Sequence, residues 1–186
     1  MIIVVFGPAG AGKSTVGRAL AERLGWRFLE GDGYHSPDNI ALMRGGKPLG
    51  DADRRAWLAA LAREIATHIA DGRDAVLACS ALKRSYRAAL IPACASTGDV
   101  QFVYLRVPRE VLEARLRTRR EHFFPAELLE TQLVNLEEPA EEEPAPVLEV
   151  DGAGAVDAIV ETICTGLALS PARPANARAA KPRGAQ

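Results

Sequence analysis

The stretch GPAGAGKS, residues Gly7–Ser14, decides the fold of this chain. It follows a short apolar run, Ile2–Phe6, and leads into a segment with helical spacing, which is the context that a phosphate-binding loop requires. Glycines let the backbone turn tightly and bring its N–H groups close to phosphate oxygens, and a helix N-terminus adds partial positive charge. A glycine-rich turn that only joins strand to helix is the alternative, but the Lys-Ser pair favours nucleotide binding.

Two side chains of this loop are assigned roles. Lys13 is expected to reach the β- and γ-phosphates of a nucleotide, and the Ser14 hydroxyl is expected to ligate Mg²⁺. Motors, transporter ATPases and GTPases usually need a strand that ends in Asp, and the run AVLACSALK has none. Asp151, at the end of VLEVD, is interpreted as a strand-end cap. The chain is therefore predicted to be a small-molecule kinase.

Apolar runs outside the loop predict a parallel sheet with helices on both faces. Asp51 is the expected N-cap of the longest helix, Ser36 of the one before it, and Gly25 the C-cap of the first. Ligands of such sheets gather beyond the carboxyl ends of the strands. Strands are predicted at 2–6, 27–30, 75–78, 101–105 and 147–150, and helical segments at 13–25, 36–46, 51–72, 83–93, 108–120, 125–136 and 155–169.

Composition is that of an ordinary globular protein with one domain, predicted over residues 1–169. The formal net charge of −1 gives no global attraction to nucleic acid or membranes, and no segment approaches a membrane span. Three scattered cysteines favour a reducing cytosol, so a soluble cytoplasmic protein is expected. Residues 170–186 carry four basic side chains and no acid, and they are predicted to be a disordered tail, with a nucleic-acid-binding arm as the alternative.

A polar cluster follows the second predicted strand, in FLEGDGYHSPDN. A carboxylate at Asp32 would orient an acceptor hydroxyl and receive its proton. Tyr34 and His35 would hydrogen-bond a polyhydroxylated substrate, and Gly33 suits an unusual backbone torsion. The alternative makes Asp32 and Ser36 helix caps and leaves His35 exposed.

Two basic clusters lie at the same predicted edge of the sheet. Lys83 follows the third strand and would bind an anionic group, or else it is a solvated lysine of a helix start. Arg115 and Arg119 are four residues apart on one predicted helical face, and His122 extends this face toward Pro125. Arginines there would neutralise charge on a transferred phosphoryl group, unless the face is simply solvated.

These motifs together closely resemble the thermoresistant type of gluconokinase. Beyond the phosphate loop, the resemblance is carried by Gly31–Asp32 with His35, by GKPLGDADRRAWL, by CSALKRSYR and by RREHF. It covers nearly all of residues 3–150. It implies a P-loop three-layer α/β/α fold, with a five-stranded parallel sheet in the order 2-3-1-4-5 and a short lid.

The resemblance also implies an activity and a set of site residues. The activity is ATP-dependent phosphorylation of D-gluconate at its 6-hydroxyl, with Mg²⁺, by a homodimer. Lys13, Asp32 and Arg119 would be catalytic, and His35, Arg54, Lys83 and His122 would join Asp32 in binding substrate. Nucleotide and metal would be bound by Gly7, Pro8, Ala9, Gly10, Ala11, Gly12, Lys13, Ser14, Thr15 and Arg115.

Three positions depart from the family pattern, namely Gly33, Tyr34 and Glu121. Gly33 and Glu121 motivate the alternative of a nucleotide-binding regulator without turnover. A kinase of another hydroxy acid such as shikimate is also kept, although CSALK is not a glycine-rich acceptor loop. A polynucleotide kinase would use the basic tail, and adenylate kinase is disfavoured because the lid is too short.

Overall fold

Five parallel strands form the centre of the molecule in the order β2-β3-β1-β4-β5. The computed structural model describes residues 1–118 and 126–170. The predicted fold class and strand order are confirmed, and the predicted lid at 119–124 lies outside the described residues. The strands are β1 (Ile2–Phe6), β2 (Arg27–Glu30), β3 (Ala75–Cys79), β4 (Val100–Arg106) and β5 (Val147–Asp151).

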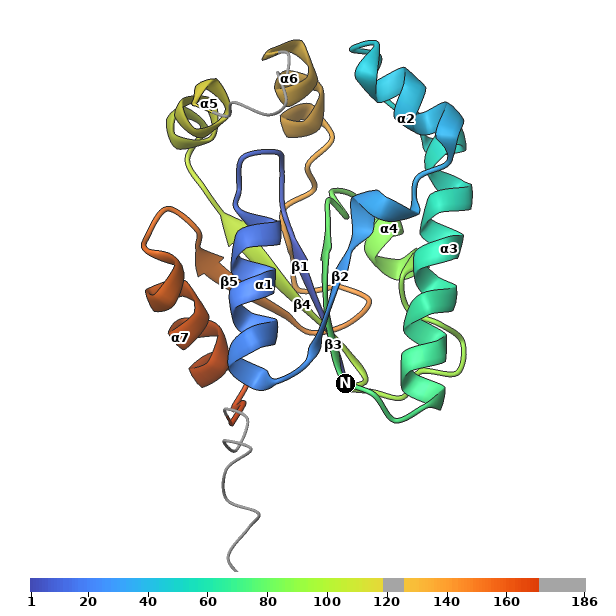
Figure 1. The fold of residues 1–186 in the computed structure, drawn as a ribbon, viewed down its shortest axis with the longest axis vertical. Helices are drawn as coiled ribbons and strands as arrows, with labels where there is room; N and C mark the ends of the chain where they lie inside the picture. The colour runs from blue at the N-terminus through green and yellow to red at the C-terminus, as the bar shows by residue number, and fades with distance from the viewer. Residues whose placement is uncertain (119–125, 171–186) are drawn as a thin grey trace, which may run out of the picture.

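Helices cover both faces of this sheet, as Figure 1 shows. On one face, α1 (Lys13–Leu24) and α7 (Val156–Gly166) pack on an apolar cluster, and α3 (Asp51–Ala70) and α4 (Arg84–Ala89) pack on the other. Alternate side chains of β1 serve the two clusters, with Ile3 and Val5 on one face and Val4 and Phe6 on the other. Every residue of β1 and β3 is buried. Because helices cover these strands on both faces, their sequences are continuous apolar runs.

Two of the predicted helix ends are confirmed. Gly25, with φ of 68°, ends α1 in the left-handed conformation that glycine favours. The Ser36 hydroxyl accepts a hydrogen bond from the Asn39 N–H at 3.2 Å and caps α2 (Pro37–Arg44), which begins at the predicted proline.

The predicted N-cap at Asp51 is wrong, because Gly50 occupies that position. The Asp53 carboxylate accepts a hydrogen bond from the Gly50 N–H at 2.8 Å, so the third helical residue closes the helix start. Asp51 is the first helical residue, and its carboxylate binds Lys83 and Tyr86 instead. Asp51, one residue after the N-cap, therefore connects α3 to Lys83 and Tyr86 rather than capping the helix.

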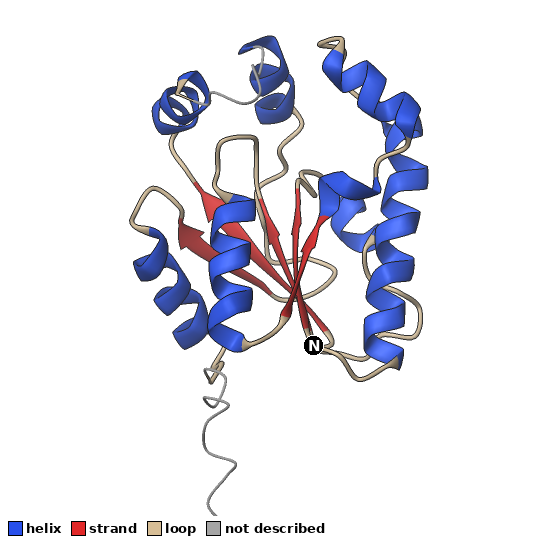
Figure 2. Cartoon of the chain, in the orientation of Figure 1, coloured by secondary structure: helices blue, strands red, loops and turns tan. Residues whose placement is uncertain are grey.

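The later helices are shorter than predicted. The helix predicted over 83–93 is α4, Arg84–Ala89, because Pro92 disfavours helical geometry at the residue before it. The predicted 108–120 helix is α5 (Arg109–Arg117), and those predicted over 125–136 and 155–169 are α6 (Ala126–Val134) and α7. Figures 1 and 2 show that α2, α5 and α6 lie beyond the carboxyl ends of the strands. Within the described ranges, no helix is long and apolar enough to cross a bilayer.

Candidate active site

The phosphate loop joins β1 to α1 at the carboxyl edge of the sheet. Gly10 and Gly12 have φ of 83° and 94°, which β-carbon-bearing residues rarely adopt. A β-carbon at Gly10 would also lie 3.0 Å from the Leu112 carbonyl oxygen of α5. The Lys13 ammonium folds over the loop and donates to the Pro8 carbonyl oxygen at 2.9 Å. The loop has the tight backbone and the lysine position that its motif predicts.

Arg115 braces this loop from α5. Its guanidinium donates to the carbonyl oxygens of Gly10 and Ala11 at 3.3 and 3.4 Å, and to that of Ala153 at 3.2 Å. The structure thus places Arg115 against the loop that it is predicted to serve. Its direct contact with a nucleotide stays a prediction.

The acceptor segment starts at the 3₁₀ helix η1 (Gly31–Tyr34), directly after β2. A β-carbon at Gly31 would lie 2.5 Å from the Ala78 carbonyl oxygen, so only glycine lets η1 approach β3 this closely. The Trp57 indole N–H donates to the Gly31 carbonyl oxygen at 2.8 Å and ties η1 to α3. The sequence interpretation missed Gly31, although a glycine directly after an apolar strand is a signal of close backbone approach. Asp32 is exposed at this edge.

His35 lies beneath Asp32 and is buried, with 8% of its surface exposed. Its ring stacks on Trp57, with centroids 4.4 Å apart and planes at 11°. Burial lowers the pKa of His35, the Asp32 carboxylate opposes this shift, and Arg54 adds to it. The ring is therefore neutral at pH 7, and its buried Nδ1 has no partner among the described residues. The alternative of an exposed His35 is wrong.

Lys83 and Arg54 form the cationic side of the acceptor region. The Lys83 ammonium donates to the two Asp51 carboxylate oxygens at 2.8 and 3.1 Å, and Tyr86 donates its hydroxyl to the same carboxylate. The hydrogen bond to Asp51 raises the pKa of Lys83. The Arg54 guanidinium lies 5.7 Å from the Tyr86 ring centroid and 6.0 Å from that of Trp57. Lys83 is the N-cap residue of α4, and its ammonium is bound to the Asp51 carboxylate.

Charges from both halves of the site meet around Cys79, the last residue of β3. Burial raises the pKa of the Cys79 thiol to about 12; the Asp32 carboxylate adds to this rise, and Lys13 and Arg54 oppose it. A thiol with so high a pKa is no nucleophile at neutral pH. Of the other two cysteines, Cys164 is buried and Cys94 is exposed.

The two family departures within η1, Gly33 and Tyr34, cause no backbone strain. Gly33 has no positive φ, and a β-carbon there would meet no atom within 4 Å, so the predicted unusual torsion is wrong. Tyr34 packs on the apolar cluster under α3, and burial raises the pKa of its hydroxyl. Neither residue distorts the backbone that presents Asp32. Arg119, Glu121 and His122 lie outside the described residues.

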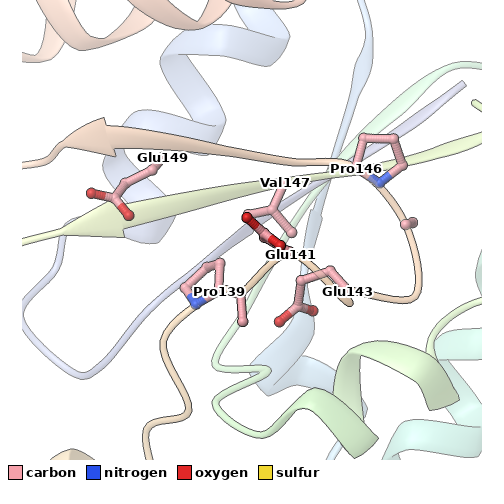
Figure 3. A pocket seen from close by; sticks show the side chains of 8 residues that line it. Pro139, Glu141, Glu143, Pro146, Val147 and Glu149 are labelled. Atoms are coloured by element: carbon pink, nitrogen blue, oxygen red, sulfur yellow. The ribbon is translucent and has the colours of Figure 1, made fainter.

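A separate hollow of about 570 Å³ opens beside β5 (Figure 3), and no predicted site residue lines it. Two of its carboxylates are already paired. Glu143 binds Arg87 through two oxygens, and Glu149 lies 3.1 Å from Arg106. Asp151, at the end of the same strand, accepts a hydrogen bond from the Ala153 N–H at 2.9 Å, as expected of a strand-end cap. Neither feature belongs to the phosphate loop or to the acceptor region.

The phosphate loop and the acidic acceptor edge beside it define a P-loop kinase of small molecules. A family model described as "AAA domain" matches residues 2–139. The gluconokinase of Gluconobacter oxydans is 44% identical over 164 residues, which span 87% of this chain and 88% of that protein. The thermoresistant gluconokinase of Escherichia coli is 37% identical over 168 residues, covering 89% and 94% of the two chains.

A solved structure gives the same result in three dimensions. The gluconokinase from Sinorhizobium meliloti superposes with a TM-score of 0.77 at 44% identity, over 89% of this chain and 90% of that one. The chain belongs to the gluconokinase family. The resemblance inferred from its motifs is confirmed.

Proposed function

We propose that this chain transfers the γ-phosphoryl group of ATP to the 6-hydroxyl of D-gluconate, giving 6-phospho-D-gluconate and ADP. The observation that carries the proposal is the position of Lys13, Asp32 and Arg54 at the carboxyl edge of the sheet: Lys13 follows β1, Asp32 follows β2, and the Arg54 guanidinium lies 5.7 Å from the ring centroid of Tyr86 in α4. A phosphate-binding lysine, a carboxylate and a guanidinium at one sheet edge suit an anionic, hydroxylated acceptor. The names of the relatives support the same substrate.

On the nucleotide side, the backbone N–H groups of residues 7–15 would bind the phosphates of ATP. Lys13 would move its ammonium from the Pro8 carbonyl oxygen to the β- and γ-phosphates. Mg²⁺ would neutralise charge on the phosphates, and the half-buried Ser14 hydroxyl on the first turn of α1 suits a cation that takes oxygen ligands. Among the described residues, no three His, Cys, Asp or Glu side chains form a metal site.

On the acceptor side, Asp32 would orient the 6-hydroxyl and accept its proton as the oxygen attacks in line. Neutral His35 would hydrogen-bond a sugar hydroxyl. Arg54 and Lys83 would bind the substrate carboxylate, with Lys83 releasing Asp51 or sharing it. Arg115 would support the nucleotide, and Arg119 and His122 would act on the γ-phosphate and the sugar.

A coupled assay of ADP release tests the proposal, with gluconate, shikimate, other sugar acids and nucleosides as acceptors. We expect turnover with gluconate above all others when Mg²⁺ is supplied. Release only with another acid would establish the alternative kinase, and ATP binding without turnover would establish the regulator. Polynucleotide phosphorylation that disappears when residues 170–186 are deleted would establish the end kinase.

The role of Asp32 is tested by Asp32→Asn. We expect this variant to bind ATP as wild type does and to lose turnover by about 100-fold or more, because the amide cannot accept the proton. Turnover near the wild-type value would show that Asp32 is neither base nor orienter. We further propose, from the family resemblance, a cytoplasmic homodimer, and sedimentation of the purified chain tests the dimer.

A further inference from the structure

The peptide group between Pro8 and Ala9 is held from both sides. Its carbonyl oxygen accepts from the Lys13 ammonium at 2.9 Å, and its N–H donates to the Gln132 side-chain oxygen at 2.7 Å. Lys13 lies in the phosphate loop, whereas Gln132 comes from α6, 123 residues further along the chain than Ala9. A single peptide group thus connects Lys13 of the loop motif with Gln132, a residue to which the sequence motifs assign no role.

This position borders the place of the γ-phosphate. The Lys13 ammonium, which here rests on the Pro8 carbonyl oxygen, would reach the β- and γ-phosphates from the same loop, so this peptide group lies within the reach of one lysine side chain of that end of the phosphate chain. Because the Gln132 oxygen faces the Ala9 N–H, the amide nitrogen occupies the other branch of the side chain. That nitrogen carries two N–H donors and meets no acceptor among residues 1–118 and 126–170.

The segment that carries Gln132 also reaches the acceptor side. Three residues after α6 ends, the Glu137 N–H donates to the Leu82 carbonyl oxygen at 2.9 Å, and the Glu137 carboxylate accepts from the Arg84 N–H at 2.6 Å. These contacts fix both ends of the segment, one on the phosphate loop and one on the loop that presents Lys83. Gln132 is therefore held at the border between nucleotide and acceptor.

We propose that Gln132 binds the γ-phosphoryl group of ATP, with its oxygen anchored on Ala9 and its amide N–H groups donating to the phosphoryl oxygens. The inference rests on the proposed kinase function and adds a residue to it. A neutral amide held in place supplies hydrogen bonds to the charge that spreads over the transferred group, without exchanging a proton. Binding of ADP, which lacks that group, does not use the contact.

Two isosteric variants test the inference by ligand titration, which needs no acceptor. Gln132→Met removes both polar atoms, and Gln132→Glu keeps an acceptor for Ala9 but replaces the donors by negative charge. We expect both to bind the β,γ-imido analogue of ATP about tenfold more weakly, with ADP affinity within about twofold of wild type. Turnover should fall about 10- to 100-fold. Val134→Ala, which changes an exposed residue of the same helix, is the control and should match wild type.

Equal weakening of ADP and of the analogue would reduce Gln132 to a structural residue and overturn the inference. Gln132→Glu with wild-type affinity for the analogue would also overturn it, since the donors would then be dispensable. If Gln132→Met fails to fold, Gln132→Glu makes the same comparison. A wild-type chain that binds the analogue but never phosphorylates gluconate would contradict the proposed function while leaving this titration decisive for Gln132.

Discussion

The two halves of the site are built in different ways. The phosphate loop is one continuous stretch shaped by its own backbone, with glycines at positive φ and a lysine bound to a loop carbonyl, and the Arg115 and Gln132 side chains brace it from α5 and α6. The acceptor half is assembled from η1, the start of α3 and the β3–α4 loop, and side chains hold it together: the His35–Trp57 stack and the Asp51–Lys83 ion pair. Backbone geometry is common to many P-loop proteins, whereas single side chains can be exchanged. We therefore expect substrate choice to depend on the acceptor half.

The largest effect is expected in the nucleotide half, at Lys13. Lys13→Ala should cost on the order of 3–5 kcal/mol of transition-state stabilisation, as loss of other preorganised charge contacts does. The measurement is kcat/KM for ATP in the ADP-release assay at saturating gluconate. Lys47→Ala, at an exposed lysine, is the control and should retain activity. A loss of less than tenfold at Lys13 would show that the backbone alone carries the phosphates.

This contrast also explains what the sequence could predict. The loop motif and the strand-end positions of Asp32 and Lys83 follow from local spacing and the geometry of parallel sheets, whereas the strand order is implied by the family resemblance. Tertiary partners do not: Asp51 looks like a helix cap until its distance to Lys83 is known. Gln132 looks like an ordinary helix residue, because its partner Ala9 lies 123 residues away.

The scaffold of the acceptor half is tested by two glycines of η1. Gly31→Ala should lower the free energy of unfolding by about 1–3 kcal/mol, because its β-carbon would overlap the Ala78 carbonyl oxygen at 2.5 Å. Gly33→Ala, two residues away in open space, is the matched control and should change it by about 0.5 kcal/mol or less. Chemical denaturation measures both. Equal effects would mean that η1 does not depend on its close approach to β3.

A single ring in the acceptor half is expected to affect substrate binding without affecting stability. His35→Phe keeps a ring that can stack on Trp57 and removes a buried, unpartnered nitrogen, so the thermal midpoint should not fall. The KM for gluconate should rise about tenfold, with KM for ATP unchanged. His68 is also buried with one unpartnered nitrogen, on the same helix as Trp57, and His68→Phe is the control that should leave both KM values unchanged. A wild-type KM for gluconate in His35→Phe would remove His35 from the substrate contacts.

The smallest effect is expected for the ion pair that holds Lys83. The hydrogen bonds from Lys83 and Tyr86 lower the pKa of Asp51 below its ordinary value of 3.8. A carboxyl group whose pKa is lower in the folded chain stabilises it above the unfolded-state pKa, and this contribution disappears as pH falls through the folded-state pKa. Asp51→Asn should therefore lower the thermal midpoint slightly at pH 7, and the difference should shrink as pH falls below 3.8; 1 M salt should also shrink it because the pair is exposed. Affinity for the ATP analogue should stay at the wild-type value, because the Asp51 carboxylate accepts its hydrogen bonds from Lys83 and Tyr86, outside the phosphate loop. A midpoint difference that stays constant as pH falls below 3.8 would mean that Asp51 acts by packing rather than by charge.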